Sequence, residues 1–181
     1  MLSARGTGQE GETELEQRDL EQLLLRYEAG VNLLRETLAG VSRDLLDFKP
    51  APGKWTIREL TAHITDTEIV AVHRMRTVAA EREGLLTVFD QDAWINELFG
   101  AQMPVELALS CLAALRSYHA FALRRLDASA FSFTGSHEVS GSVSLQKMIQ
   151  GFTDHLEHHA AQIAAIIQQF DAMSQGSDRA E

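Results

Sequence analysis

Apolar residues recur along most of this chain with the spacing of helices that bury one face. In the first such segment, three- and four-residue steps join Leu20, Leu23, Leu24, Tyr27, Val31, Leu34 and Leu38. The pattern predicts four long helices, at about 14–40, 57–83, 104–127 and 145–173. We therefore expect an all-α protein, an up-down-up-down four-helix bundle with a long connection between its second and third helices.

Local signals mark several helix starts. Thr56 and Glu59 have the spacing of a capping box, in which each side chain bonds the other residue's backbone N–H. Pro104 is predicted to open the third helix, and Ser144 to cap the fourth. The connection 84–104 is predicted to hold a short helix around Asp90–Phe99.

The remaining segments lack helical spacing. Residues 128–143 are rich in Ser, Gly and Phe, and a short hairpin is expected there. The polar segment 1–13 is predicted to be disordered, and 174–181 to be a flexible tail. One domain over 14–173 remains, which is long enough to bury a core.

The charge balance excludes several partners. The chain has 16 basic and 26 acidic residues and a net charge of −10, which argues against binding to nucleic acid or to an anionic membrane surface. No apolar run approaches the ~20 residues of a transmembrane helix. The N-terminus has no apolar signal core, so a cytoplasmic location is expected. The single cysteine, Cys111, is predicted to be a small buried hydrophobe rather than a nucleophile.

Histidines in the fourth helix carry the first chemical signal. His155 and His159 lie one turn apart at the apolar face, whereas His158 points outward. Side chains four residues apart have Cβ atoms about 6 Å apart, so both rings can reach one metal ion. The alternative is that these are ordinary core and surface histidines. However, two buried neutral imidazoles need polar partners, and a metal would satisfy one nitrogen of each.

His63 is the best candidate for a third ligand. In an up-down-up-down bundle the second and fourth helices run in the same direction, which places His63 within about 6–12 Å of the pair in height. It lies on the flank of its helix's apolar face. His73 and His137 fit no ligand position, and the semi-buried His119 is a weaker candidate for a group that supports the ligands.

Two neighbouring residues are candidates for supporting roles. Glu59 lies one turn before His63 and Gln162 one turn after His159, where each could bond a ligand's other ring nitrogen. Glu59 could also serve as a general base. Each residue has a simpler explanation, because Glu59 fits a helix cap and Gln162 a helix flank.

These motifs together resemble those of the DinB-like (YfiT-like) superfamily over roughly residues 15–172. The resemblance rests on Lys54–Leu60 followed by His63, and on His155–Ile163 with its His-x-x-x-His and Gln-Ile elements. It implies a four-helix bundle, often a homodimer, with zinc, nickel or a similar metal on His63, His155 and His159. Many relatives have Arg-Gly where this chain has Ala160-Ala161, which puts any role of that arginine in doubt.

Three protein ligands leave a coordination position open, which favours catalysis over a closed structural site. The resemblance includes transferases that use bacillithiol, mycothiol or glutathione, so we predict a metal-dependent low-molecular-weight-thiol S-transferase acting on small electrophiles. The first alternative is a hydrolase using a metal-bound water. The second is a non-catalytic metal-binding stress protein, whose site should be closed by a fourth ligand such as His158 or Glu59.

Overall fold

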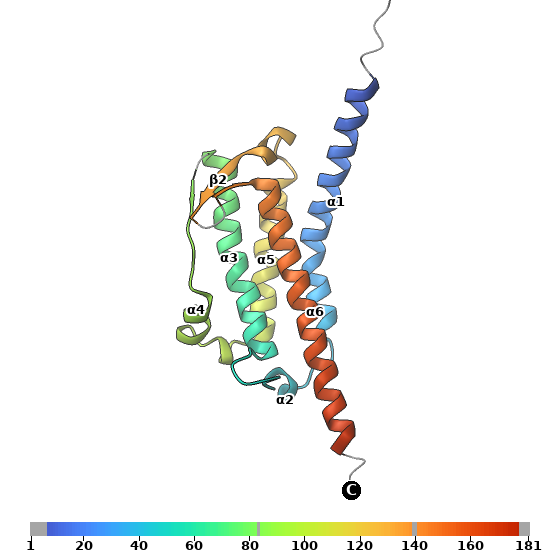
Figure 1. Cartoon of the computed structure of the whole chain (residues 1–181), viewed down its shortest axis with the longest axis vertical. Coiled ribbons are helices and arrows are strands. Elements are labelled where there is room, and N and C mark those ends of the chain that lie inside the picture. Colours follow the sequence, from blue (N-terminus) through green and yellow to red (C-terminus); the bar gives the residue numbers. More distant parts are fainter. Residues whose placement is uncertain (1–6, 83, 139–140, 178–181) are drawn as a thin grey trace, which may run out of the picture.

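A computed structural model describes residues 7–82, 84–138 and 141–177 of the chain. Four long helices form a bundle (Figure 1), and they are α1 Thr7–Thr37, α3 Ile57–Glu81, α5 Val105–Leu123 and α6 Leu145–Ser177. The predicted four-helix bundle is therefore confirmed. Helix α1 packs against α5 and α6, and α3 packs against the same two helices, so α3 and α6 are neighbours.

The directions of the helices differ from the expected up-down-up-down order. One core cluster joins Leu34, near the end of α1, to Ile57 and Leu109, near the starts of α3 and α5, and to Ile163 in the second half of α6. The other cluster joins the opposite halves of the same helices. Helices α3 and α5 therefore run in one direction, and α1 and α6 run in the other (Figure 1). The long connection between α3 and α5 makes this possible, because it returns the chain along the bundle.

That connection contains a two-residue strand, β1 Leu85–Leu86, the helix α4 Gln91–Glu97 and the 3₁₀ turn η1 Gly100–Gln102. Strand β1 pairs in parallel with β2 Thr134–His137, which pairs antiparallel with β3 Gly141–Ser144. The expected hairpin and the short helix near residue 94 are thus present. The sequence pattern did not predict β1, the 3₁₀ turn η2 Ala128–Ser132 or the short helix α2 Arg43–Leu46.

The helix caps follow the sequence signals closely. Thr56 Oγ1 accepts from the Glu59 N–H at 3.1 Å, and Glu59 Oε2 accepts from the Thr56 N–H at 2.7 Å, which confirms the capping box. Ser144 Oγ accepts from the Lys147 N–H at 3.2 Å at the start of α6. Pro104 stands one position earlier than predicted, as the residue that caps α5.

Two helices extend beyond their predicted ends. Residues 7–13 belong to α1, where disorder was expected, and residues 174–177 belong to α6, where a flexible tail was expected. Once a helix has formed, each added residue gains a backbone hydrogen bond, so the helix can outlast its apolar face. Residues 1–6 and 178–181 lie outside the described residues.

Two further predictions concern burial and membranes. Cys111 is a free, half-buried thiol rather than a fully buried one. Within the described ranges, none of the helices combines the length and the apolar character needed to cross a bilayer.

Candidate metal centre

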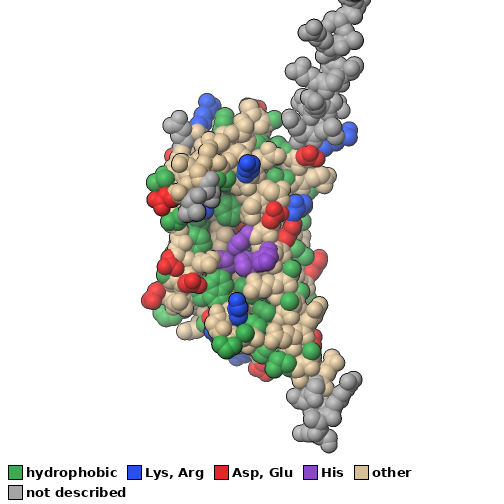
Figure 2. Space-filling view, in the orientation of Figure 1, with side chains coloured by type: hydrophobic (Ala, Val, Ile, Leu, Met, Phe, Trp, Pro, Cys, Tyr) green, Lys and Arg blue, Asp and Glu red, His purple; other side chains and the backbone are tan. Residues whose placement is uncertain are grey.

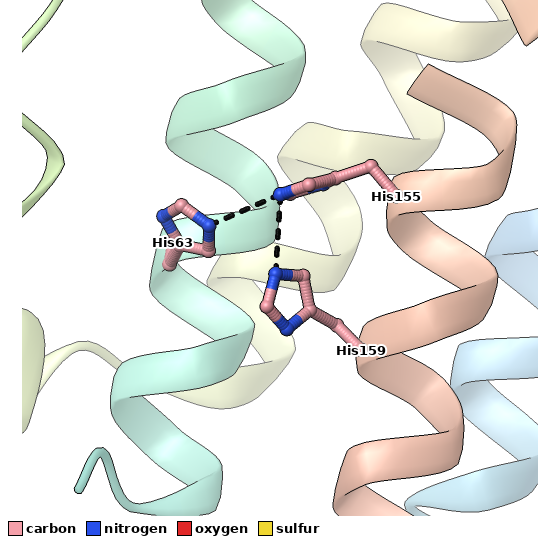
Figure 3. Close-up of side chains that lie close together, drawn as sticks. All are labelled: His63, His155 and His159. Carbon is pink, nitrogen blue, oxygen red and sulfur yellow. Dashed lines mark hydrogen bonds between the residues drawn. The ribbon is translucent and has the colours of Figure 1, made fainter. Parts of the chain in front are cut away.

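The structure brings together the three histidines that the sequence singled out. His63 lies in the second turn of α3, and His155 and His159 lie on successive turns of the neighbouring α6 (Figure 3). The Nε2 atom of His155 lies 3.2 Å from that of His63 and 3.1 Å from that of His159. Among the described histidines, cysteines and acidic residues, this is the group whose ligand atoms, all within 4.8 Å of one another, could hold a metal ion.

The spacing of these nitrogens fits a shared cation. Bonds of about 2.0–2.1 Å from one metal ion separate its ligand nitrogens by about 2.9–3.4 Å at angles between octahedral and tetrahedral. Without a cation, His155 Nε2 would face two other ring nitrogens while carrying at most one proton for them. The donor set, three imidazoles and no thiolate, suits zinc, nickel, copper or iron.

All three imidazoles are held in the neutral form that metal binding requires. Burial lowers the pKa of His63 to about 4, with a further contribution from repulsion by His159. Burial also lowers the pKa of His155 to about 3, helped by its histidine neighbours. The pKa of His159 is lowered by burial, although its bond to Gln162 acts in the other direction. Protons therefore compete weakly for these nitrogens at neutral pH.

Of the two predicted supporting residues, Gln162 forms a hydrogen bond with a histidine of the cluster. Its Oε1 lies 2.9 Å from His159 Nδ1, and an amide oxygen can only accept, so Nδ1 carries the proton. The His159 Nε2 lone pair then faces the cluster. Glu59 is buried, but its carboxylate bonds the Thr56 N–H in the helix cap and is not a member of the three-histidine group.

The cluster is buried on one side and accessible on the other. The His63 side chain is only 2% exposed and packs against Trp55 with ring centroids 4.7 Å apart. His155 and His159 are half-buried, and histidine side chains reach the surface between α3 and α6 in Figure 2. His158 is exposed beside His159, as predicted, with ring centroids 5.4 Å apart.

A pocket of about 250 Å³ adjoins His155. Its walls come from α3, the three strands and α6, and its lining residues are Arg74, Leu86, His137, Val143, Lys147, Met148, Gly151, Phe152 and His155. Of the three clustered histidines, His155 is the one that lines this pocket. The arrangement matches an open site rather than one closed by the protein.

The other histidines lie outside the cluster. His73 is exposed on α3, and His137 belongs to strand β2 in the pocket wall. His119 is 1% exposed and packs edge-on against Tyr27, with ring centroids 6.3 Å apart. Burial lowers the pKa of His119 to about 4. None of these three joins the metal-binding group in the described part of the chain.

Sequence reasoning missed a buried polar network beside the site. Arg116 of α5 donates to Glu68 of α3 at 2.8 Å, to the Tyr27 carbonyl of α1 at 2.6 Å and to the Phe152 carbonyl of α6 at 3.2 Å. The Tyr27 hydroxyl also donates to Glu68, and burial raises the pKa of that phenol. The network thus joins all four helices, and Phe152 lies three residues before His155. The sequence did offer a signal for this network, because Glu68 and Arg116 are charged residues at positions on the apolar faces of their helices.

The family model of the DinB superfamily matches residues 26–163 of this chain. The chain belongs to the DinB superfamily. A DinB relative from Oceanobacillus iheyensis, described as a proposed metal-dependent hydrolase, is 30% identical over 77% of this chain and 80% of its own length. A second protein from the same organism, with the same description, is 25% identical over 80% of this chain and 83% of its own length.

Two solved structures share the fold. YfiT from Bacillus subtilis, described as a proposed metal-dependent hydrolase with an unusual four-helix bundle topology, aligns with a TM-score of 0.80 at 17% identity, over 94% of each chain. A mycothiol-dependent maleylpyruvate isomerase aligns with a TM-score of 0.65 at 16% identity. It covers 80% of this chain, which in turn spans 60% of the isomerase. The same bundle fold is therefore found in proteins described by different activities.

Proposed function

We propose that this protein is a divalent-metal-dependent enzyme that transfers a low-molecular-weight thiol to a small electrophile. The observation that carries the proposal is the convergence of three neutral histidine nitrogens beside a pocket. His63, His155 and His159 would hold the cation. When bound, such a cation lowers the pKa of a thiol or water that it coordinates and so supplies a nucleophile at neutral pH.

The chain's own residues would bind and orient the reactants. Gln162 holds the His159 ring in the tautomer that presents Nε2. Trp55 packs on His63 and keeps water from that side of the ring. The apolar pocket residues Leu86, Val143 and Phe152 would take up the body of an electrophile next to His155. Cys111 does not have to act as a nucleophile, because the reacting thiol is a co-substrate.

Two features support thiol transfer over hydrolysis. A hydrolase commonly pairs its water with a carboxylate base. No Asp or Glu belongs to the metal-binding group of the described residues, and Glu59, the predicted base, is engaged in the helix cap. A thiol needs no such base, since metal coordination itself favours the thiolate.

Hydrolysis is the second candidate, favoured by the description of the relatives from Oceanobacillus iheyensis as proposed metal-dependent hydrolases. A purely structural metal site is the third. Against it, the half-buried rings of His155 and His159 border a pocket, and His158 lies exposed beside the cluster rather than within it.

The test begins with the metal. The untagged protein is purified and its metals measured by elemental mass spectrometry, beside His159→Ala and the matched control His158→Ala on the same helix. We expect about one metal ion per chain in the wild type and the control, and none in His159→Ala. A wild type that binds no metal, and whose melting temperature does not rise with added Zn²⁺ or Ni²⁺, would refute the proposal.

The second part of the test separates the reactions. Consumption of glutathione, bacillithiol or mycothiol is measured with 1-chloro-2,4-dinitrobenzene as the electrophile, and ester hydrolysis is measured without thiol. Thiol transfer that is lost in His159→Ala and kept in His158→Ala supports the first candidate. Hydrolysis with the same dependence supports the second, and a loaded protein inactive in both assays supports the third.

Three further features belong to the proposal. Zinc or nickel is the metal we expect, and the elemental analysis will identify it. A homodimer and a cytoplasmic location are also expected. Sedimentation of the purified protein tests the first of these, and fractionation of the source cells tests the second.

A further inference from the structure

The pocket beside the histidines has two chemically distinct ends. His155 forms one end, and the cationic residues Arg74 and Lys147 stand elsewhere in the lining. Lys147 precedes His155 by eight residues on α6, a rise of about 12 Å. Arg74 follows His63 by eleven residues on α3, a rise of about 16 Å. Because α3 and α6 run in opposite directions, both cations lie on the same side of the metal centre.

Neither cation is neutralised by a carboxylate of the described residues. No acidic residue lines the pocket, and the ion pairs found in residues 7–82, 84–138 and 141–177 do not include Arg74 or Lys147. This is notable in a chain whose net charge is −10. A half-buried guanidinium without a counterion is costly, and burial does lower the pKa of Arg74.

Arg74 is also held in place. Its Nε donates to the Thr87 carbonyl at 2.9 Å, and its Nη2 donates to the same oxygen. A carbonyl just beyond β1 thus fixes the guanidinium at the pocket wall while leaving it its full charge. A preorganised guanidinium binds carboxylates and phosphates strongly, because its donors match their oxygens.

The space between the two ends is mostly apolar, and His137 is the other polar side chain of the lining. Leu86, Val143 and Phe152 line it, and Gly151 faces it from α6. A Cβ atom added at Gly151 would meet nothing within 4 Å. A glycine inside a helix costs about 0.5–1 kcal/mol relative to alanine, and here it leaves room for a ligand.

We infer that this pocket binds a small organic anion, with its carboxylate or comparable acidic group at Arg74 and Lys147, its apolar body against Leu86, Val143 and Phe152, and its other end at the metal centre beside His155. That this anion is a substrate rests on the proposed function. The anion could be the electrophile or an acidic thiol, and the two share the same recognition chemistry. That the pocket binds the anion rests on the pocket residues alone.

The test compares two probes of equal size, 4-phenylbutanoate and its uncharged amide, with the metal-loaded full-length protein. Their dissociation constants are measured by calorimetry or saturation-transfer NMR. We expect the acid to bind at least about fivefold more tightly than the amide, because a charge-assisted bond to Arg74 or Lys147 is stronger than a neutral one. Equal binding of acid and amide would overturn the inference.

Three variants locate the site. Lys147→Gln, at an exposed residue that should not affect folding, and Arg74→Met should each weaken binding of the acid at least about fivefold. Gly151→Leu should abolish binding by filling the space, while improving the helix. The control Arg35→Gln removes an exposed charge on α1 and should change nothing. If Lys147→Gln and Gly151→Leu bind the acid like the wild type, the inference is wrong.

A direct bond between the carboxylate and the metal is distinguished by comparing Lys147→Gln with His159→Ala. Such binding would be lost in His159→Ala and indifferent to Lys147→Gln, and this pattern would also overturn the inference. The metal content of each variant separates the two proposals. Charge-dependent binding in a protein without metal supports the pocket while refuting the proposed function. A protein that holds metal but binds the acid and the amide equally would overturn the pocket inference and leave the proposed function standing. The electrophile and the thiol are distinguished by asking which reactant's KM rises in Lys147→Gln.

Discussion

His159 and Gln162 form a hydrogen bond one turn apart on α6, with His159 Nδ1 2.9 Å from Gln162 Oε1. The other nitrogen of the same ring, Nε2, lies 3.1 Å from His155 Nε2. One side of the imidazole is therefore fixed by an acceptor, and the other is presented to the cluster. Gln162 thus sets the tautomer and the orientation of a proposed metal ligand.

We predict that Gln162→Leu lowers metal affinity by about 10–100-fold, because the His159 ring loses the acceptor that orients it. Gln162→Glu keeps an acceptor and should keep the affinity. Competition with a chelator of known affinity measures both. The control is Gln168→Leu, at an exposed position farther along α6. Equal affinities for Gln162→Leu and this control would show that the hydrogen bond does not support the site.

A substitution at Glu59 can distinguish a role in capping the helix from a role as a general base. Glutamine can replace glutamate in a capping box, so Glu59→Gln should leave stability within about 0.5 kcal/mol and leave activity unchanged. Thr56→Ala removes the side chain that accepts from the Glu59 N–H, and should cost about 1 kcal/mol by urea unfolding. A loss of about 100-fold or more in kcat for a stable Glu59→Gln protein would instead identify Glu59 as a general base and favour the hydrolase.

The buried pair Glu68–Arg116 should be strongly coupled. Either Glu68→Leu or Arg116→Met leaves an unpaired buried charge and should cost about 3–5 kcal/mol in the free energy of unfolding. The double variant should cost clearly less than the sum of the two. The control is Arg124→Met. Arg124 follows the last residue of α5 and pairs with Glu28 of α1, but this pair is partly exposed and should be worth about 0–1 kcal/mol. Additive single effects in unfolding experiments would contradict the coupling.

Gly30 gives an independent test of that network. A Cβ atom at this position of α1 would lie 2.5 Å from Arg116 Nη1 and 3.0 Å from Leu156 Cδ2. Gly30→Ala therefore has to displace the guanidinium from the Tyr27 carbonyl, and should destabilise the protein by about 1–3 kcal/mol although alanine favours helices. In the Arg116→Met background the same change should cost less. A stabilising Gly30→Ala would show that Arg116 moves without cost.

The sequence was sufficient for what depends on local spacing. The apolar steps, the Thr56 cap and the outward phase of His158 all follow from one helix at a time, and the structure agrees with each. Periodicity carries no information on direction, so the parallel course of α3 and α5 could not be read from it. The argument that placed His63 level with His155 and His159 assumed that α3 and α6 run in the same direction, whereas they run in opposite directions. It still selected the histidine of α3 that lies beside the pair, with His63 Nε2 3.2 Å from His155 Nε2.

What the sequence did not reveal depends on contacts between helices. Glu68 and Arg116 occupy stripe positions on α3 and α5, but their pairing requires knowing that these helices are neighbours. Strand β1 has two residues, too few for an alternating pattern. The pocket likewise joins Arg74 to residues more than sixty positions away, so its charge became visible only in the fold.

The low pKa values of the histidines predict how the metal-free protein responds to acid. His63 and His155 titrate near pH 4 and 3 when folded, against about 6.5 when unfolded. The unfolded chain therefore binds more protons between these pH values. The stability that the two neutral histidines contribute is complete above about pH 6.5 and is lost as the pH falls toward 4. Discounting for the half-exposed His155, we expect His63 and His155 to contribute a loss of about 2 kcal/mol between pH 7 and pH 5, measured by urea unfolding with a chelator present. His119, whose pKa is also lowered to about 4, adds to this loss.

Two controls assign this loss to the cluster. The exposed His158→Gln variant should lose as much stability as the wild type over the same pH range. A His63→Leu, His155→Leu double variant should lose less, because two of the groups that take up protons on unfolding are gone, while His119 and His159, whose pKa values are also lowered, still contribute. Metal-loaded wild type should remain more stable than the metal-free protein at every pH where it keeps its ion, since the ion binds the deprotonated rings of the folded state. If the metal-free wild type and the double variant respond equally to acid, the protons are taken up elsewhere, and the histidines are not held neutral by their surroundings.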